Sequence, residues 1–235
     1  MIFINGCSFS ETQNKDISSR WKPWSDYLVD DYSQHTSIFN KSVSSNGQGK
    51  ILDTTIEIIE SFPFSEKEEI DAAIIQFSAV SRGYATNFDK FVEKITQNTN
   101  YQSLLHEDEY NLSEEDSVTD LITHVDWLYY KSTLCKIICL KNYFENKNIP
   151  YLFFWGWQQI TDEMSKDSTI KTLLQKCYDG NWWRFGEHGG LSEWGIDKFG
   201  KDSAILPEDF HPTTLVHENF YKEIIKPYLN KHMKI

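Results

Sequence analysis

The sequence has few basic residues relative to its acidic residues, and it has no long apolar run. Its 235 residues include 23 Lys and Arg against 35 Asp and Glu, which gives a formal net charge of −12. We expect no nucleic-acid partner, because phosphate contacts need clustered Lys and Arg, and no adhesion to anionic lipid. No stretch reaches the roughly eighteen apolar residues of a membrane span. These absences exclude whole classes of partner and leave the oligomeric state open.

The four cysteines lack the spacing of a zinc site or a disulfide framework. They are Cys7, Cys135, Cys139 and Cys177, and none forms a Cys-x-x-Cys pair. Cys135 and Cys139 would share a helix face, but no further Cys or His ligand is near them. The sequence also lacks the glycine motifs that bind phosphates. We therefore expect reduced, mostly buried cysteines, no metal and no cofactor.

The chain starts with MIFINGCSFSE. The apolar part of this segment is too short, and the rest is too polar, for a signal peptide. A cytoplasmic location is therefore the default expectation.

Short apolar runs alternate along the chain with segments of helical periodicity. We expect strands at 1–5, 36–43, 71–77 and 151–155, and helices at 22–33, 51–62, 118–147, 167–178 and 213–231. This alternation predicts an α/β protein, a three-layer α/β/α sandwich with a mostly parallel, flavodoxin-like central sheet. Residues 1–235 are expected to form one domain. The acidic stretch 84–117 and the Gly- and Trp-rich stretch 179–200 are expected to be insertions or long loops.

Two short motifs at opposite ends of the chain contain a possible nucleophile and a possible base. Ser8 in N-G-C-S-F-S follows the first strand, where backbone N–H groups can stabilise an oxyanion. His211 in E-D-F-H-P precedes the last helix, where a nearby carboxylate can orient its ring. Taken alone, each motif has a plainer interpretation, a helix cap or a helix-start turn. In a doubly wound sheet, however, both points can meet beyond the carboxyl ends of the strands.

These motifs resemble the first and last sequence blocks of the SGNH (GDSL-like) hydrolase superfamily. G-C-S-F-S is similar to its first block, with Cys7 where Asp is commonest, and D-F-H-P is similar to its last. The resemblance covers nearly the whole chain and implies the SGNH hydrolase fold. It implies Ser8 as nucleophile, His211 as base, Asp209 or alternatively Glu208 as the carboxylate that orients His211, and no cofactor.

The resemblance also implies an oxyanion hole in which the Ser8 N–H is joined by an N–H from the second block. We prefer Gly47 as that donor, because close approach of backbone to substrate favours glycine. Ser45 is the alternative. A plain turn-shaping role for Gly47 is equally open.

The third block departs from the superfamily pattern. Its usual Asn side chain would donate a third hydrogen bond, but Val80 stands at that position and cannot donate. Loss of one such donor typically costs about 10²–10³ in rate. Ser81 and Arg82 are nearby substitutes, and Arg82 could instead bind an anionic group of the substrate. An ordinary surface or salt-bridging arginine is the plainer interpretation of Arg82.

Tryptophan is frequent, with 8 residues in the chain. Trp155 is expected in the core. Trp157, Trp182 and Trp183 are candidate substrate-binding residues, because exposed indole rings stack well on sugars. For Trp182 and Trp183 we weigh a rim or lid role equally with a place in the core.

The pattern as a whole predicts a serine hydrolase that cleaves an ester, such as an acetyl or short acyl group on a carbohydrate. A hypothesis from a different class is a catalytically weak SGNH-like module that binds a glycan or a protein. A third hypothesis makes Cys7 the nucleophile. Neighbouring side chains on a turn point in different directions, so we expect Ser8 to face the site and Cys7 to be buried.

Overall fold

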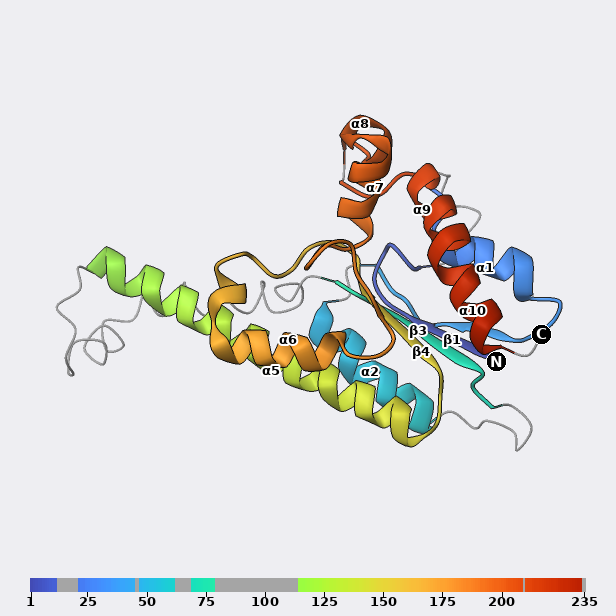
Figure 1. Cartoon of the computed structure of the whole chain (residues 1–235), viewed down its shortest axis with the longest axis horizontal. Coiled ribbons are helices and arrows are strands. Elements are labelled where there is room, and N and C mark those ends of the chain that lie inside the picture. Colours follow the sequence, from blue (N-terminus) through green and yellow to red (C-terminus); the bar gives the residue numbers. More distant parts are fainter. Residues whose placement is uncertain (12–20, 45–46, 62–68, 79–113, 209, 234–235) are drawn as a thin grey trace.

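The protein is an α/β/α sandwich around one parallel sheet of five strands. A computed structural model describes residues 1–11, 21–44, 47–61, 69–78, 114–208 and 210–233. The strands are β1 (Ile2–Asn5), β2 (Ile38–Asn40), β3 (Ala72–Phe77), β4 (Tyr151–Trp155) and β5 (Trp182–Trp183). They lie in the order β2-β1-β3-β4-β5, and every pairing is parallel (Figure 1). The predicted α/β class and flavodoxin-like sheet are confirmed.

Helices cover both faces of this sheet. One face carries α1 (Trp24–Tyr32), α9 (Thr214–Phe220) and α10 (Lys226–His232), with the π-helical turn η2 (Tyr221–Ile225) between the last two. The other face carries α2 (Gln48–Ser61), α5 (Glu114–Asn146) and α6 (Ser168–Tyr178), the last preceded by the 3-10 turn η1 (Met164–Lys166). Figure 1 shows α7 (Leu191–Phe199) and α8 (Lys201–Ala204) projecting beside α9.

The central strands are apolar on both sides because both sheet faces are buried. All residues of β1 and β3 are buried, as expected for strands inside a parallel sheet. Successive side chains point to opposite faces. Ile2 and Ile4 therefore pack with α1, α9 and α10, whereas Phe3 packs with α2, α5 and α6.

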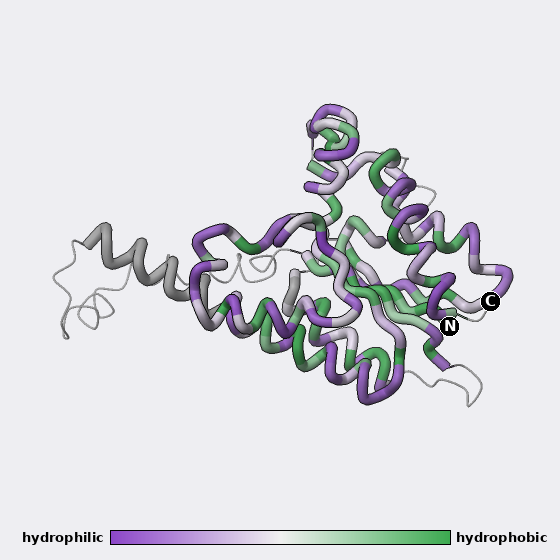
Figure 2. Tube along the Cα trace, viewed as in Figure 1, coloured by the Kyte–Doolittle hydropathy of each residue, from purple (hydrophilic) through white to green (hydrophobic). Residues whose placement is uncertain are grey.

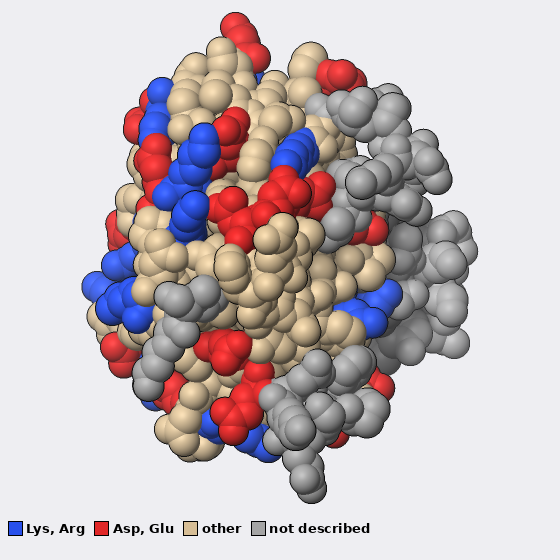
Figure 3. Space-filling model, turned by 90° about the vertical axis from the view of Figure 1, so that its right-hand side faces the viewer, with Lys and Arg blue, Asp and Glu red and all other residues tan. Residues whose placement is uncertain are grey.

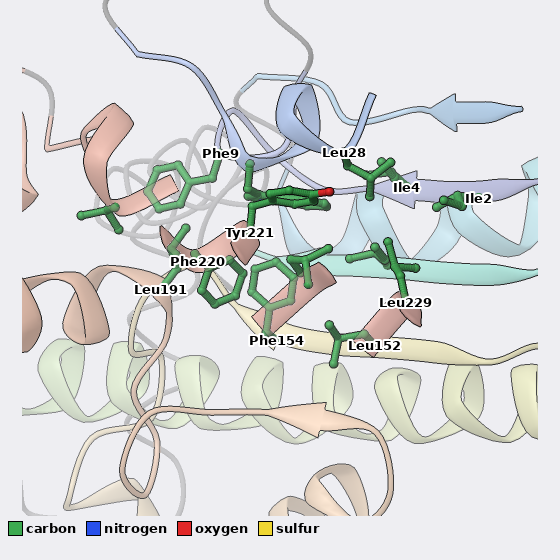
Figure 4. Packing of buried hydrophobic residues seen from close by; sticks show 14 of the residues in the cluster. Ile2, Ile4, Phe9, Leu28, Leu152, Phe154, Leu191, Phe220, Tyr221 and Leu229 are labelled. Carbon is green, nitrogen blue, oxygen red and sulfur yellow. The ribbon is translucent and has the colours of Figure 1, made fainter. Parts of the chain in front are cut away.

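Each face has its own apolar core. Figure 4 shows the first core, in which Phe220 lies beside Phe154 of β4 and Phe9 lies at one end of the cluster. The ring centroids of Phe154 and Phe220 are 4.9 Å apart. Figure 2 shows that the central strands are mostly hydrophobic, whereas hydrophobic and hydrophilic residues alternate along the helices.

Helix α7 begins where the chain passes very close to the end of β4. A Cβ atom on Gly190 would lie 2.4 Å from the carbonyl oxygen of Trp155, so only glycine fits there. The Glu193 carboxylate accepts hydrogen bonds from the N–H groups of Gly190 (2.8 Å) and Gln158 (2.9 Å). These contacts fix the start of α7 against the carboxyl edge of the sheet.

For 179–200 an insertion or a long loop was expected, and the long loop is wrong, because this stretch contains β5 and α7. Whether it is an insertion stays a prediction. Strand β5 has two residues, too few to show the period-two alternation that marks a strand in a sequence. Of the stretch 84–117, residues 84–113 lie outside the described part of the chain, and 114–117 begin α5.

Acidic and basic side chains are interspersed on the face shown in Figure 3. Ion pairs join Lys198 to Glu223 and Lys226 to Asp31 across separate helices. Among the described helices none has the length and apolar character needed to cross a membrane. The described side chains also contain no cluster of three His, Cys, Asp or Glu that could hold a metal ion.

Candidate active site

The end of β1 is tied to helix α2 by a buried asparagine. The Asn5 side chain accepts a hydrogen bond from the Gly6 N–H (2.9 Å), and its amide nitrogen donates to Thr55 Oγ1 (2.9 Å) and to the Ile51 carbonyl (3.2 Å). Asn5 has no exposed surface, so these bonds replace those it would make with water. They fix the point at which the chain leaves the sheet just before Ser8.

The turn after β1 is held by a second buried polar residue, Gln76 of β3. Its side-chain oxygen accepts from Ser10 Oγ (2.8 Å), and its nitrogen donates to the Phe77 carbonyl (3.1 Å) and to Cys7 Sγ (3.3 Å). Ser10 Oγ in turn accepts from Trp24 Nε1 (3.1 Å). Cys7 and Ser10 are thereby held inside the core. The predicted burial of Cys7 is confirmed, which argues against Cys7 as a nucleophile.

Ser8 and His211 meet although 203 residues separate them in sequence. The Ser8 hydroxyl oxygen lies 2.8 Å from His211 Nε2, a hydrogen-bonding distance. For the serine to donate this bond, the imidazole must be neutral with its proton on Nδ1. Ser8 is only 5% exposed and His211 is half-buried. This pair has the geometry of a hydroxyl nucleophile and its general base.

The segment that carries His211 is held by short backbone contacts at both ends. The Leu206 N–H donates to the His211 carbonyl (2.8 Å), and the Thr213 N–H donates to the Ala204 carbonyl (2.8 Å). The imidazole is stacked on the Trp21 ring, with centroids 4.4 Å apart and planes 20° apart. The edge contact with Phe9 at 5.1 Å adds a second ring neighbour. These contacts set the plane of the imidazole.

Of the two carboxylates expected to orient His211, Asp209 lies outside the described residues. Glu208 is described and is exposed. The role of either carboxylate stays a prediction.

The structure describes only some of the residues expected to donate hydrogen bonds to the oxyanion. Gly47 is buried at the start of α2, beyond the carboxyl end of β2, and its carbonyl accepts from the Ile51 N–H (3.1 Å). Ser78 is fully buried directly after β3. The other candidates of the second and third blocks lie outside the described residues: Ser45, Val80, Ser81 and Arg82.

A cavity of about 370 Å³ opens beside the Ser8–His211 pair. The described residues that line it are Phe9, Trp157, Ser192, Ile196, Lys201, Ile205, Phe210 and His211. Trp157 is one of these lining residues, with its ring centroid 5.3 Å from that of Phe9. Its role in substrate binding stays a prediction.

Trp182 and Trp183 are not among these lining residues, since they are the two residues of β5. Trp182 points into the core with α5 and α6, and its centroid lies 5.4 Å from that of Phe77. Trp183 points to the opposite core, 4.7 Å from the ring of Phe220. Their positions in the sheet argue against the expected role in substrate binding. Trp155 is fully buried, as predicted.

Three features of the site escape the sequence reasoning. One is Gln76. It could have been noticed as a polar residue near the end of the otherwise apolar run in DAAIIQF. Another is the cavity wall, which comes from the 191–210 region. The third is His217 on α9, which is fully buried and whose ring nitrogens have no hydrogen-bond partner among the described residues.

His217 differs electrostatically from an exposed histidine. Burial, with a smaller contribution from His211, lowers the pKa of His217 to about 3. The ring is therefore neutral at pH 7 and places no positive charge beside Ser8 and His211.

No known protein-family model matches the sequence, and no curated protein matches it. Solved structures do match. The psychrotrophic esterase EstA from Pseudoalteromonas sp. is 14% identical, with 97% of this chain and 98% of that chain covered and a TM-score of 0.51. The YXIM protein of Bacillus subtilis is 10% identical, with 98% of this chain and 56% of that chain covered and a TM-score of 0.52.

The chain shares its fold with these proteins. AlinE4, an SGNH-hydrolase family esterase, is more remote, with 14% identity, 98% of this chain and 95% of that chain covered, and a TM-score of 0.42. At such identities a likeness shows the fold alone, so the function has to be argued from the residues of the site.

Proposed function

We propose that this protein is a serine hydrolase of the SGNH type that cleaves carboxylic esters. The observation that carries the proposal is the 2.8 Å contact between Ser8 Oγ and His211 Nε2. It joins a serine at the carboxyl edge of a parallel sheet to a histidine just before the last helices, and an open cavity lies beside it.

The reaction proceeds in two steps. Ser8 Oγ attacks the ester carbonyl carbon while His211 Nε2 takes the hydroxyl proton. The bond from carbon to the alcohol oxygen then breaks, and His211 returns the proton to that oxygen. Water next attacks the acyl carbon while His211 Nε2 takes one of its protons. The bond from that carbon to Ser8 Oγ then breaks, His211 returns the proton to Ser8 Oγ, and the acid is released. The N–H groups of Ser8 and Gly47 stabilise the oxyanion in both steps.

Two further observations support this proposal. Cys7, the neighbouring candidate nucleophile, is fully buried against Gln76, so Ser8 alone faces the histidine. One structural neighbour, EstA, is described as an esterase inhibited by monoethylphosphonate. A phosphonate reagent is accordingly a suitable probe for this chain.

For the substrate we propose an ester with a short acyl group, such as acetyl, on a carbohydrate or similar alcohol. Trp157 at the cavity is the residue most suited to stack on such an alcohol.

Fluorophosphonate labelling tests the proposal. Wild type should be labelled, and Ser8→Ala should not, because the reagent phosphonylates an activated serine hydroxyl. Ser203→Ala is the matched control, since Ser203 is exposed on α8. Its labelling should equal that of wild type.

Absence of labelling in wild type, or equal labelling of Ser8→Ala, would contradict the assignment. Together with intact folding and Ser8-independent glycan or protein binding, it would favour the non-catalytic binding module.

A further inference from the structure

The sheet order separates the Trp157 wall of the cavity from the proposed oxyanion glycine. In the sheet order, β2 lies on one side of β1, while β3 and β4 lie on the other. Gly47 follows β2, whereas Trp157, which lines the cavity, follows β4. An ester whose carbonyl oxygen points toward Gly47 therefore has that oxygen directed away from the Trp157 wall of the cavity.

The cavity wall includes the proton donor for the leaving group. His211 lines the cavity and also contacts Ser8 Oγ. In ester cleavage the histidine that takes the serine proton must then come within hydrogen-bonding reach of the alcohol oxygen. The substituent next to His211 is thus the alcohol part of the ester rather than its acyl part.

Building on the proposed function, we infer that this cavity binds the alcohol portion of the ester and contacts an apolar surface of that portion, either a hydrocarbon chain or the apolar face of a sugar ring. Five of the lining side chains are apolar: Phe9, Trp157, Ile196, Ile205 and Phe210. Ser192 and Lys201 are the polar exceptions beside His211. Walls of this kind stabilise hydrocarbon groups or the apolar face of a ring.

The exposure of two apolar side chains that line the cavity supports the binding of an apolar group there. Among the described residues only four large hydrophobic side chains are strongly exposed: Val43, Ile196, Phe210 and Leu215. Two of them, Ile196 and Phe210, line this cavity, and Phe210 is 72% exposed. A bound apolar alcohol would cover part of both side chains, which would favour binding.

The size of the cavity allows more than a methyl group. About 370 Å³ lies in the lower range of small-molecule pockets. Each methylene group moved from water into apolar surroundings is worth about fourfold in an equilibrium constant. A longer alcohol should therefore raise kcat/KM, whereas a longer acyl group should not.

Isomeric esters test the inference without changing total hydrophobicity. Hexyl acetate and ethyl hexanoate have the same atoms, but the longer chain is on the alcohol side in the first and on the acyl side in the second. We expect wild type to hydrolyse hexyl acetate with a kcat/KM at least about tenfold higher. Equal values, or a preference for ethyl hexanoate, would overturn the inference while leaving the esterase proposal intact.

A variant that narrows the cavity tests whether the preference for a long alcohol chain depends on this cavity. Ile196→Trp should lower the ratio of kcat/KM for hexyl acetate to kcat/KM for methyl acetate about tenfold. Leu215→Trp is the matched control, because Leu215 is equally apolar and exposed but is not a lining residue. If both variants act alike, or if Ile196→Trp affects ethyl hexanoate more, the cavity does not bind the alcohol.

Ser8→Ala separates this outcome from failure of the proposed function. If wild type turns over none of these esters faster than Ser8→Ala, the esterase proposal fails and the inference fails with it.

Discussion

Ser8 stands on a turn whose neighbouring side chains are hydrogen-bonded inside the core, whereas His211 stands on a segment held by backbone contacts and by stacked rings. On the serine side, Gln76 binds Ser10 and Cys7, and all three are buried. On the histidine side, the adjacent Phe210 is exposed and lines the cavity.

This difference suggests a division of roles between two regions. Changes on the serine side should mainly affect stability, because buried polar groups lose their partners. Changes on the histidine side should mainly affect substrate choice, because that segment is also a cavity wall.

The largest expected effect is on catalysis, where both regions should behave as one unit. Ser8→Ala and His211→Gln should each lower kcat by roughly 10⁴–10⁶, and the double variant should be little worse than either single one. Steady-state kinetics on a short-chain acetate would measure this. Independent, additive losses would show that the two residues do not act in the same step.

The next largest effect should be on stability and should be confined to the serine side. Gln76→Leu leaves the Ser10 hydroxyl without the acceptor that Gln76 provides, whereas the Phe77 carbonyl keeps its hydrogen bond from the Gly156 N–H (2.8 Å). The free energy of unfolding should fall by about 1–3 kcal/mol for each group left unpaired. Urea denaturation measures the change, with Gln175→Leu as the control because Gln175 is exposed on α6. If the free energy of unfolding changed by the same small amount in both variants, the buried hydrogen bonds on the serine side would not contribute to stability as described.

The buried His217 should make the free energy of unfolding depend on pH. In the unfolded chain it takes up a proton below about pH 6.5, whereas in the folded protein its pKa is lowered to about 3. Between these values the unfolded state binds more protons, so stability falls as the pH falls, by about 1.4 kcal/mol per pH unit inside the window.

Removing the imidazole should remove this contribution. His217→Leu should lose less stability than wild type between pH 6.5 and pH 4, as measured by urea unfolding at each pH. His35→Gln is the matched control, because His35 is exposed. Parallel pH profiles for wild type and His217→Leu would mean that the buried ring does not titrate as described.

The smallest expected stability effect comes from the histidine side. Phe210 has a φ of 59°, a left-handed conformation that glycine adopts without cost. Phe210→Gly relieves that strain but makes the unfolded chain more flexible, so the free energy of unfolding should change by less than about 1 kcal/mol. Hydrolysis of hexyl acetate should nevertheless fall several-fold, because a cavity wall is lost. A large loss of stability would show that this segment is also structural.

Most of the fold could be predicted from the sequence. The strand expected at 151–155 is β4 to the residue, and the strand expected at 71–77 starts one residue later, at Ala72. Both are buried on two faces, which leaves a continuous apolar run in the sequence. Strand β5 escaped because two residues carry no period, and its two tryptophans suggested a surface loop.

The site could be predicted only in outline. The proximity of Ser8 and His211 could be predicted, because each lies in a short motif at a point where the loops of a doubly wound sheet come together. The cavity wall was not found, since Ile196, Ile205 and Phe210 form no motif and meet only through the packing of α7 and α8. The buried bonds of Gln76 likewise depend on the pairing of β1 with β3.

The most direct test of the central claim is the site of covalent modification. After treatment with a fluorophosphonate, mass spectrometry of the N-terminal peptide would locate the adduct on Ser8 or on its neighbour Cys7. The account predicts one phosphonyl group per chain, on Ser8, and a much slower reaction in His211→Gln. An adduct on Cys7, or an unmodified peptide from folded protein, would contradict it.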